Sequence, residues 1–210
     1  MNWTKKKKLL VFIPILLLSL FVTAILLIGV SPIPFDPSLE FPIEESGKID
    51  HIRPYGVPDW SGPGTHHNGI DLVINDTVTI ISPVKGTVMG ITEHKNPHSE
   101  NSNILFSVSI LINWGWAVEL CIEPNFNGDD TYNNTLQRNA IKVSILQRVN
   151  IGDPIADLLY ANDGSHLHYG LRGTFIGDFC AYRYSSNYAR AIFDSIPMGD
   201  GFLTDPICII

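Results

Sequence analysis

Beyond position 50, the apolar residues fall into short segments and form no long helical stripe. The segments are rich in β-branched residues and are separated by Gly, Pro, Asn and Asp, a pattern typical of strands joined by turns. The expected strands span residues 71–81, 86–91, 104–112, 117–122 and 167–171. The pattern therefore predicts a mainly β fold.

One late segment has helical character. Ser185 or Ser186 can cap a run in which Tyr188, Ala191 and Ile192 share one face. This expected helix belongs to a C-terminal extension, residues 173–210.

The first 30 residues follow a different pattern. Residues 9–30 form a run of 22 residues without a charge, which is long enough to cross the hydrocarbon core of a membrane. Four lysines at positions 5–8 precede it and predict a short cytoplasmic stub, residues 1–8. A cleaved signal peptide is the alternative, but the run exceeds the usual apolar core of such peptides and lacks a clear cleavage site. We therefore expect a single-pass membrane protein, anchored by this helix in the cell membrane, with its C-terminal part extracellular.

The segment after the apolar run is rich in proline. Pro32, Pro34, Pro37 and Pro42 are typical of a semi-extended spacer, which we place at residues 31–46. The main domain is then expected at residues 47–172.

Charge narrows the range of partners. Ten of the 14 basic residues and all 21 acidic residues lie beyond the four lysines, which gives that part a formal charge of −11. So acidic a surface disfavours nucleic acid as a ligand. The sequence does not predict an oligomeric state.

The chain has three cysteines, so at least one of them is unpaired within a monomer. An extracellular location permits disulfides. We prefer a bond between Cys180 and Cys208, which would tie the end of the chain to the domain, with Cys121 free. Three free thiols remain the alternative.

Two short motifs about a hundred residues apart carry the candidate chemistry. The first runs from His67 to Asp71 (HNGID), and the second, SHLHYG, contains His166 and His168. A catalytic zinc site has three protein ligands and one open position, and His and Asp are suitable donors. His67, Asp71 and His168 meet this requirement. Residues i and i+2 of a strand point to the same face, so His166 would stand beside His168 and face the open position.

Four segments together resemble the lysostaphin-type (LytM-like) zinc metallopeptidases. They are residues 64–72 (GTHHNGIDL), 82–88 (SPVKGTV), 149–156 (VNIGDPIA) and 166–169 (HLHY), in the order found in that family. The resemblance covers roughly residues 50–172. It implies a small antiparallel β-sheet or barrel-like domain with a groove that binds Zn²⁺ and cleaves peptide bonds, usually in peptidoglycan cross-bridges. It also implies that His67, Asp71 and His168 bind the metal and that His166 is catalytic.

The sequence departs from the family pattern at its centre. Members carry a second catalytic histidine in a Tyr-x-His-Leu segment, whereas residues 115–124 read GWAVELCIEP. Ile122 falls at the histidine position, within about one residue of register. Glu123, Glu119 or Cys121 is a candidate replacement, and we select Glu123 as the second catalytic residue.

Two functions follow from these observations. The first is a membrane-anchored extracellular zinc endopeptidase acting on a peptide or peptidoglycan substrate. The second is a catalytically impaired zinc-bearing module that binds cell-wall or peptide ligands or regulates other hydrolases. A purely structural domain would require both metal motifs to be accidental.

Overall fold

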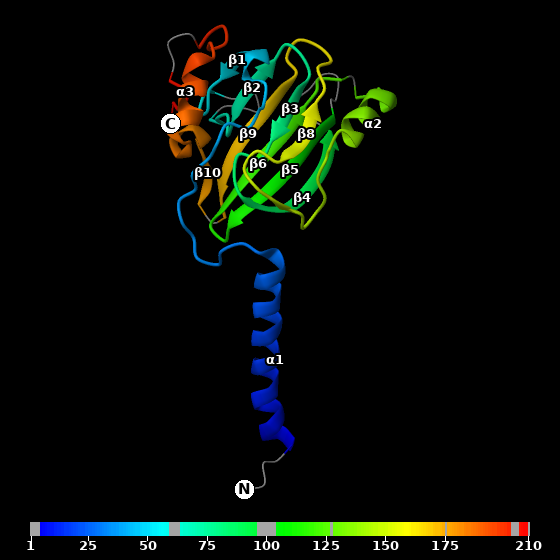
Figure 1. Ribbon diagram of the computed structural model, residues 1–210, viewed down its shortest axis with the longest axis vertical. Helices are drawn as coiled ribbons and strands as arrows, with labels where there is room; N and C mark the ends of the chain where they lie inside the picture. The colour runs from blue at the N-terminus through cyan, green and yellow to red at the C-terminus, as the bar shows by residue number, and fades with distance from the viewer. Residues whose placement is uncertain are drawn as a thin grey trace.

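The computed structural model describes residues 5–58, 64–95, 104–126, 128–174, 176–202 and 206–209, with backbone alone for residues 5–11 and 24–28. A large antiparallel sheet forms the centre of the molecule (Figure 1), with strand order β1-β2-β9-β6-β5-β4-β7 and β10 paired with β9. Its strands are β1 (Ile49–Arg53), β2 (Ile70–Ile74), β4 (Gly86–Lys95), β5 (Ile104–Asn113), β6 (Trp116–Glu123), β7 (Arg148–Val149), β9 (His166–Gly173) and β10 (Gly177–Phe179). A two-stranded sheet combines β3 (Val78–Ile81) and β8 (Pro154–Leu158). The prediction of a mainly β, antiparallel fold is confirmed.

The two faces of the large sheet differ in polarity. Leu72, Leu167 and Ile122 lie side by side on β2, β9 and β6 and are fully buried. They share one hydrophobic core with the apolar residues of β3 and β8, which lie over this face of the sheet (Figure 1). Because successive side chains of a strand alternate between faces, Asp71 and His168 point to the opposite, open face.

Segments outside the expected domain also pack into this core. Leu39 and Phe41, from the predicted spacer, are buried, and Phe41 meets Phe193 edge to face at a centroid distance of 4.7 Å. The C-terminal extension contributes the 3₁₀ turn Ala181–Tyr184 and helix α3 (Asn187–Ser195). The predicted disulfide between Cys180 and Cys208 is present, so that part of the prediction is confirmed.

Helix α3 begins as predicted, but its buried face is different. The Ser186 hydroxyl caps the helix by accepting a hydrogen bond from the Ala189 amide. The residues that α3 buries are Ala189 and Phe193, whereas Tyr188 is 72% exposed. Helix α2 (Thr131–Asn139) and strands β1, β7, β8 and β10 were not predicted from the sequence.

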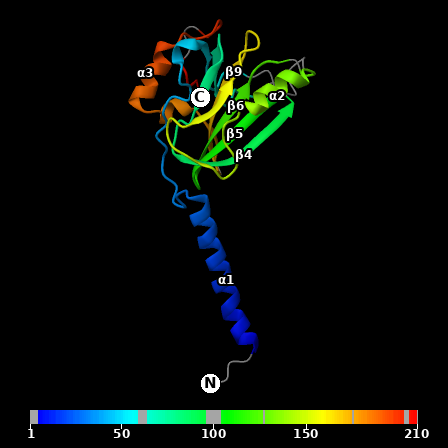
Figure 2. The same cartoon turned by 45° about the vertical axis from the view of Figure 1, so that its right-hand side comes forward.

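Helix α1 (Lys5–Ile28) contains most of the apolar run and projects away from the domain (Figures 1 and 2). Within the part of the chain that the structure describes, no helix combines the length and the apolar character needed to cross a membrane. The prediction of a transmembrane helix is therefore not supported.

Candidate metal centre

The candidate site lies on the open face of the large sheet, where β2, β9 and β6 run side by side. Asp71 on β2 is directly opposite His168 on β9. On the other side of β9, Cys121 is opposite His168 and Glu123 is opposite His166. Residues that face each other across antiparallel strands project to the same side of the sheet. The pairing therefore gathers the candidate residues of three strands in one place.

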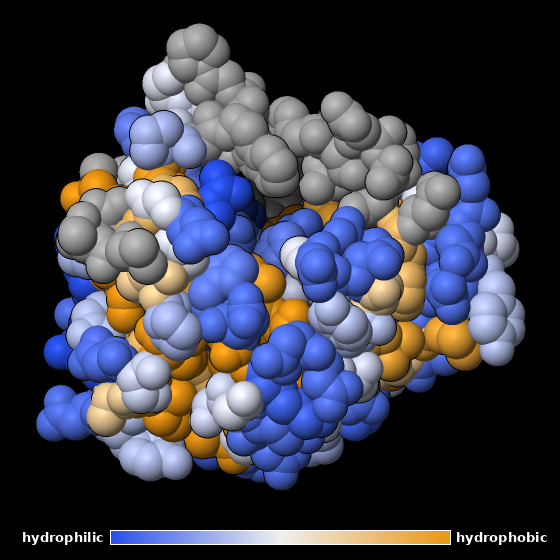
Figure 3. Space-filling model, turned by 90° about the horizontal axis from the view of Figure 1, so that it is seen from above, coloured by the Kyte–Doolittle hydropathy of each residue, from blue (hydrophilic) through white to orange (hydrophobic). Residues whose placement is uncertain are grey.

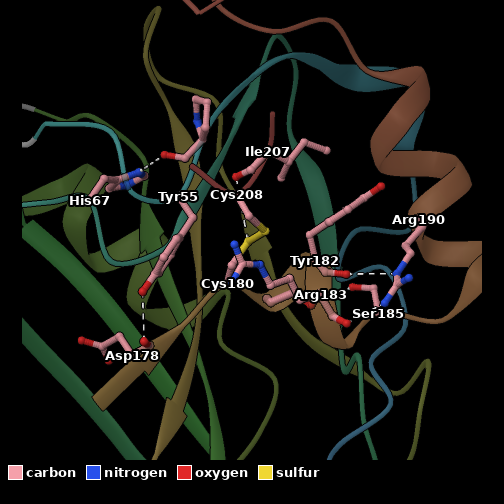
Figure 4. The surroundings of a disulfide bond; sticks show 12 residues. Tyr55, His67, Asp178, Cys180, Tyr182, Arg183, Ser185, Arg190, Ile207 and Cys208 are labelled. Carbon is pink, nitrogen blue, oxygen red and sulfur yellow. Dashed lines mark hydrogen bonds between the residues drawn. A yellow bond between two sulfur atoms is a disulfide. The ribbon is translucent and has the colours of Figure 1, made fainter. Parts of the chain in front are cut away.

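His67 reaches the site from the loop before β2. Its amide donates to the Val57 carbonyl at 2.9 Å, and its own carbonyl accepts from the Gly56 amide at 2.8 Å. The His67 imidazole is buried, and its Nδ1 lies 2.8 Å from the Pro54 carbonyl oxygen (Figure 4). A carbonyl only accepts, so Nδ1 carries the hydrogen of this bond. In the neutral ring, Nε2 then presents a lone pair to the site.

The first motif needs a glycine at position 69 because the His168 ring fills the space beside it. A Cβ atom added at this position would lie 2.4 Å from Nε2 of His168. Any side chain here would therefore displace the His168 ring from Asp71.

Three donor atoms converge at this point. Oδ1 of Asp71 lies 2.9 Å from Nε2 of His67 and 2.9 Å from Nδ1 of His168, and the two nitrogens are 3.1 Å apart. A tetrahedral zinc ion with ligands at about 2.0–2.1 Å requires donors about 3.3 Å from one another. Three acceptor atoms packed so closely need a cation or a proton between them. The arrangement thus fits a divalent metal held by His67, Asp71 and His168, in agreement with the ligand set expected from the sequence.

Charges around the three donors are strongly coupled. Burial opposes the ionisation of Asp71, but His166, His168 and His67 outweigh it and hold the pKa of this carboxyl well below its usual range. Burial likewise favours the neutral form of His67, yet Asp71 raises the pKa of its imidazole. Protons therefore compete with a metal for this site.

His166 stands beside the three donors without joining them. Its Nδ1 donates to the Gly164 carbonyl at 2.7 Å, which leaves Nε2 3.4 Å from Oε2 of Glu123 and 3.8 Å from Oδ1 of Asp71. Burial alone would lower the pKa of His166, but the negative charges of Asp71 and Glu123 raise it. The imidazole is thus placed to hold a proton at Nε2 next to the metal position.

Strand β6 contributes two side chains to the face that carries the site. Ile122 is fully buried in the core and faces away from the site, whereas its neighbours, within the one-residue uncertainty of the sequence assignment, face the site. The side chains that face the site are Cys121 and Glu123. The Cys121 thiol lies 3.7 Å from Oε1 of Glu123, and burial strongly raises its pKa, so the thiol stays protonated. Glu119 lies further along β6, opposite Gly170 and near Arg172.

Among the described residues, no other histidine belongs to the group of three donors. His66 and His94 are exposed, His94 on β4, and His98 lies outside the described residues. His51 is on β1.

The positive charge of Arg53 also reaches the site. Arg53 lies opposite Asp71 in the β1–β2 pairing, and its charge lowers the pKa of both His67 and His166. Its place beside Asp71 depends on the pairing of β1, a strand that the apolar pattern does not reveal.

No protein-family model and no curated protein sequence matches this chain. Among solved structures, the chain is similar to a zinc-containing peptidase of Vibrio cholerae, with 18% identity and a TM-score of 0.44 over 66% of this chain and 38% of that one. It is similar to Helicobacter pylori Csd3, with 18% identity and a TM-score of 0.40 over 66% of this chain and 32% of that one. It is also similar to LytU, with 19% identity and a TM-score of 0.40 over 61% of this chain and 77% of that one. The chain thus spans less than two thirds of the first two structures.

Proposed function

We propose that this chain is a zinc-dependent endopeptidase that cleaves peptide bonds. The observation that carries the proposal is the convergence of the His67, Asp71 and His168 donor atoms at 2.9–3.1 Å beside a separate His166–Glu123 pair. Peptidoglycan cross-links are the proposed substrate, because they are the class implied by the sequence resemblance.

A bound zinc ion lowers the pKa of water and polarises a carbonyl group. His166 contributes a proton at Nε2, which donates to the oxygen on which negative charge develops or to the leaving amine. Glu123 keeps His166 protonated through its negative charge and supplies a carboxylate that accepts a proton. Glu123 therefore takes the place of the second histidine expected in the family.

The experiment combines metal analysis with digestion of purified peptidoglycan. We expect about one zinc per chain, a tetrahedral three-ligand site being filled by one ion. Zinc should be lost in the His67→Ala, His168→Ala double variant. His166→Ala should retain zinc and lose hydrolysis, and His94→Ala, at an exposed position on β4, is the matched control. Hydrolysis that persists in both the double variant and His166→Ala would contradict the proposal.

A zinc-bearing binding module is the second candidate. The observation in its favour is that β6 presents a protonated thiol and a carboxylate where the family has an imidazole. This function predicts that the parent protein binds peptidoglycan fragments without cutting them and that binding weakens when zinc is stripped.

We propose an extracellular location for the domain, attached to the cell membrane through the N-terminal segment. The disulfide is in keeping with an oxidising compartment. The exposed apolar side chains of α1 between Phe12 and Val22 are in keeping with contact between this segment and lipid. Protease added to intact cells should remove a tag at the C-terminus, and full protection of that tag would refute the extracellular location.

A further inference from the structure

The segment of residues 54–57 holds the metal ligand His67 from behind. The Gly56 amide donates to the His67 carbonyl at 2.8 Å, and the His67 amide donates to the Val57 carbonyl at 2.9 Å. The imidazole Nδ1 donates to the Pro54 carbonyl at 2.8 Å. A hydrogen bond to the second ring nitrogen fixes the orientation and the tautomer of a metal-binding histidine. The position of this segment therefore determines where Nε2 of His67 lies.

Tyr55, inside this segment, is held in turn by the C-terminal extension. Its amide donates to the Ile207 carbonyl and its carbonyl accepts from the Ile209 amide, both at 3.0 Å. Cys208 lies between these two partners and forms a β-bridge with Tyr55. The disulfide joins Cys208 to Cys180, which is buried in the core (Figure 4). A continuous series of bonds thus runs from the disulfide to the His67 ring.

Residues 206–209 have little else to hold them against Tyr55. The Ile207 side chain is partly buried against the core, whereas Ile209 is 39% exposed. A segment with few buried contacts opens at a low free energy. The disulfide closes a loop of 28 residues and so restricts the freedom of this segment to leave Tyr55. Breaking the S–S bond therefore loosens the support of the loop that orients His67.

We propose that the Cys180–Cys208 disulfide positions the ligand His67, so that the zinc affinity of the site depends on the redox state of these two cysteines. A dithiol reductant breaks the S–S bond by supplying two electrons and two protons. The reductant leaves as its own disulfide, and both cysteines become thiols. The inference rests on the metal site of the proposed function. Without the bond, zinc should bind about 10- to 100-fold more weakly, the usual effect of disturbing the residues that orient a ligand.

The coupling also acts in the reverse direction. Zinc and the disulfide favour the same position of His67, so each strengthens the other by the same factor. A change of about 10- to 100-fold corresponds to about 30–60 mV for a two-electron couple. Zinc at a concentration that saturates both forms should therefore lower the reduction potential of the disulfide by this amount. A disulfide that only stabilised the fold, without coupling to the metal site, would show no such shift.

The test uses the full chain. Competition with a chromophoric chelator measures the zinc affinity of the oxidised parent and of the Cys180→Ser, Cys208→Ser double variant, which has no thiol at these positions to bind zinc. The reduction potential of the parent is measured in dithiol buffers, with and without zinc, with the free zinc concentration fixed by a chelator. Ile209→Pro keeps the disulfide but removes the amide that donates to Tyr55. It should also bind zinc more weakly, which keeps the test valid if the double variant does not fold.

Ser186→Ala is the matched control. It removes the cap of α3 in the same extension but leaves the disulfide and the bonds of Tyr55 in place, so the zinc affinity should equal that of the parent. Parent affinity in the double variant, an equal loss in Ser186→Ala, or a reduction potential that zinc does not change would overturn the inference. The two proposals fail separately. Hydrolysis with a zinc affinity independent of the disulfide keeps the peptidase and overturns this coupling, whereas coupling without hydrolysis does the reverse.

Discussion

Replacing Gly69 by alanine tests the metal site without removing a ligand. The added Cβ would lie 2.4 Å from Nε2 of His168, and 2.6 Å from its Cε1. Because the ring is held between this glycine and Asp71, it must move by about 1 Å to restore an ordinary van der Waals contact. That shift breaks the 2.9 Å approach of Nδ1 to Asp71.

The expected loss of zinc affinity is at least about 10- to 100-fold, the usual effect of disturbing the residues that orient a ligand. Overpacking should also destabilise the metal-free domain by about 1–3 kcal/mol. Competition with a chromophoric chelator measures the affinity, and thermal unfolding with excess chelator measures the stability.

Gly90→Ala is the control for this experiment. Gly90 also lies in the large sheet, but its added Cβ would be 3.7 Å from its nearest neighbour, the Ser109 Cβ, which is an ordinary contact. Unchanged zinc affinity in Gly69→Ala, or an equal loss in Gly90→Ala, would refute the geometry of the three donors.

Three further predictions concern the core, the disulfide and the effect of pH. Ile122→His should destabilise the domain by about 1–3 kcal/mol, as measured by denaturant unfolding, because it buries an unpaired polar ring in the core. A gain of hydrolysis without loss of stability would contradict the register of β6. Cys208→Ser should lower the free energy of unfolding by about 3–4 kcal/mol, because the unfolded chain regains the entropy of a loop of 28 residues that the disulfide closes. Equal stability of the reduced and the oxidised parent protein would contradict this prediction. With the metal removed by a chelator, the free energy of unfolding should fall as the pH rises above 6.5. Folding raises the pKa of His67 and His166, so the folded state binds their protons more tightly than the unfolded state, and this stabilisation is lost when the protons dissociate. Thermal unfolding between about pH 6 and pH 8 measures whether stability falls with pH. Excess zinc should reverse this pH dependence, since the metal replaces the protons.

The sequence predicted which three side chains come together because the relevant information is local. The spacing of His67 and Asp71 and the i, i+2 relation of His166 and His168 depend on one loop and one strand, and the structure brings these residues together. Which side chains of β6 point toward the site depends instead on the register of β6 against β9. A shift by one residue exchanges the two faces of a strand, so an assignment of Ile122 within about one residue could not tell from the sequence that Cys121 and Glu123 face the site.

Long-range packing explains the other differences. The apolar pattern merged β2 and β3 into one segment because it did not reveal the turn between them. The buried face of α3 is set by Phe193, whose partner Phe41 lies in the segment predicted to be a spacer. A hydrophobic pattern identifies residues that prefer burial, but it does not tell which distant segment will cover them.

The C-terminal extension contributes to the site as well as to the core. Tyr55 donates its amide to the Ile207 carbonyl and accepts from the Ile209 amide, so the residues on either side of Cys208 hold the turn that follows β1. Pro54, one residue before, fixes the His67 ring through its carbonyl. The disulfide therefore ties the segment that supports Tyr55 to Cys180 on the core (Figure 4). Viewed from the end opposite α1, the described part of the surface shows hydrophilic residues interspersed with apolar ones (Figure 3). The extension thus supports one of the three donor residues from behind, and the bonds from the Ile52 amide to the Pro197 carbonyl and from the Gly199 amide to the Ile52 carbonyl, both 2.9 Å, add residues 197–199 alongside β1.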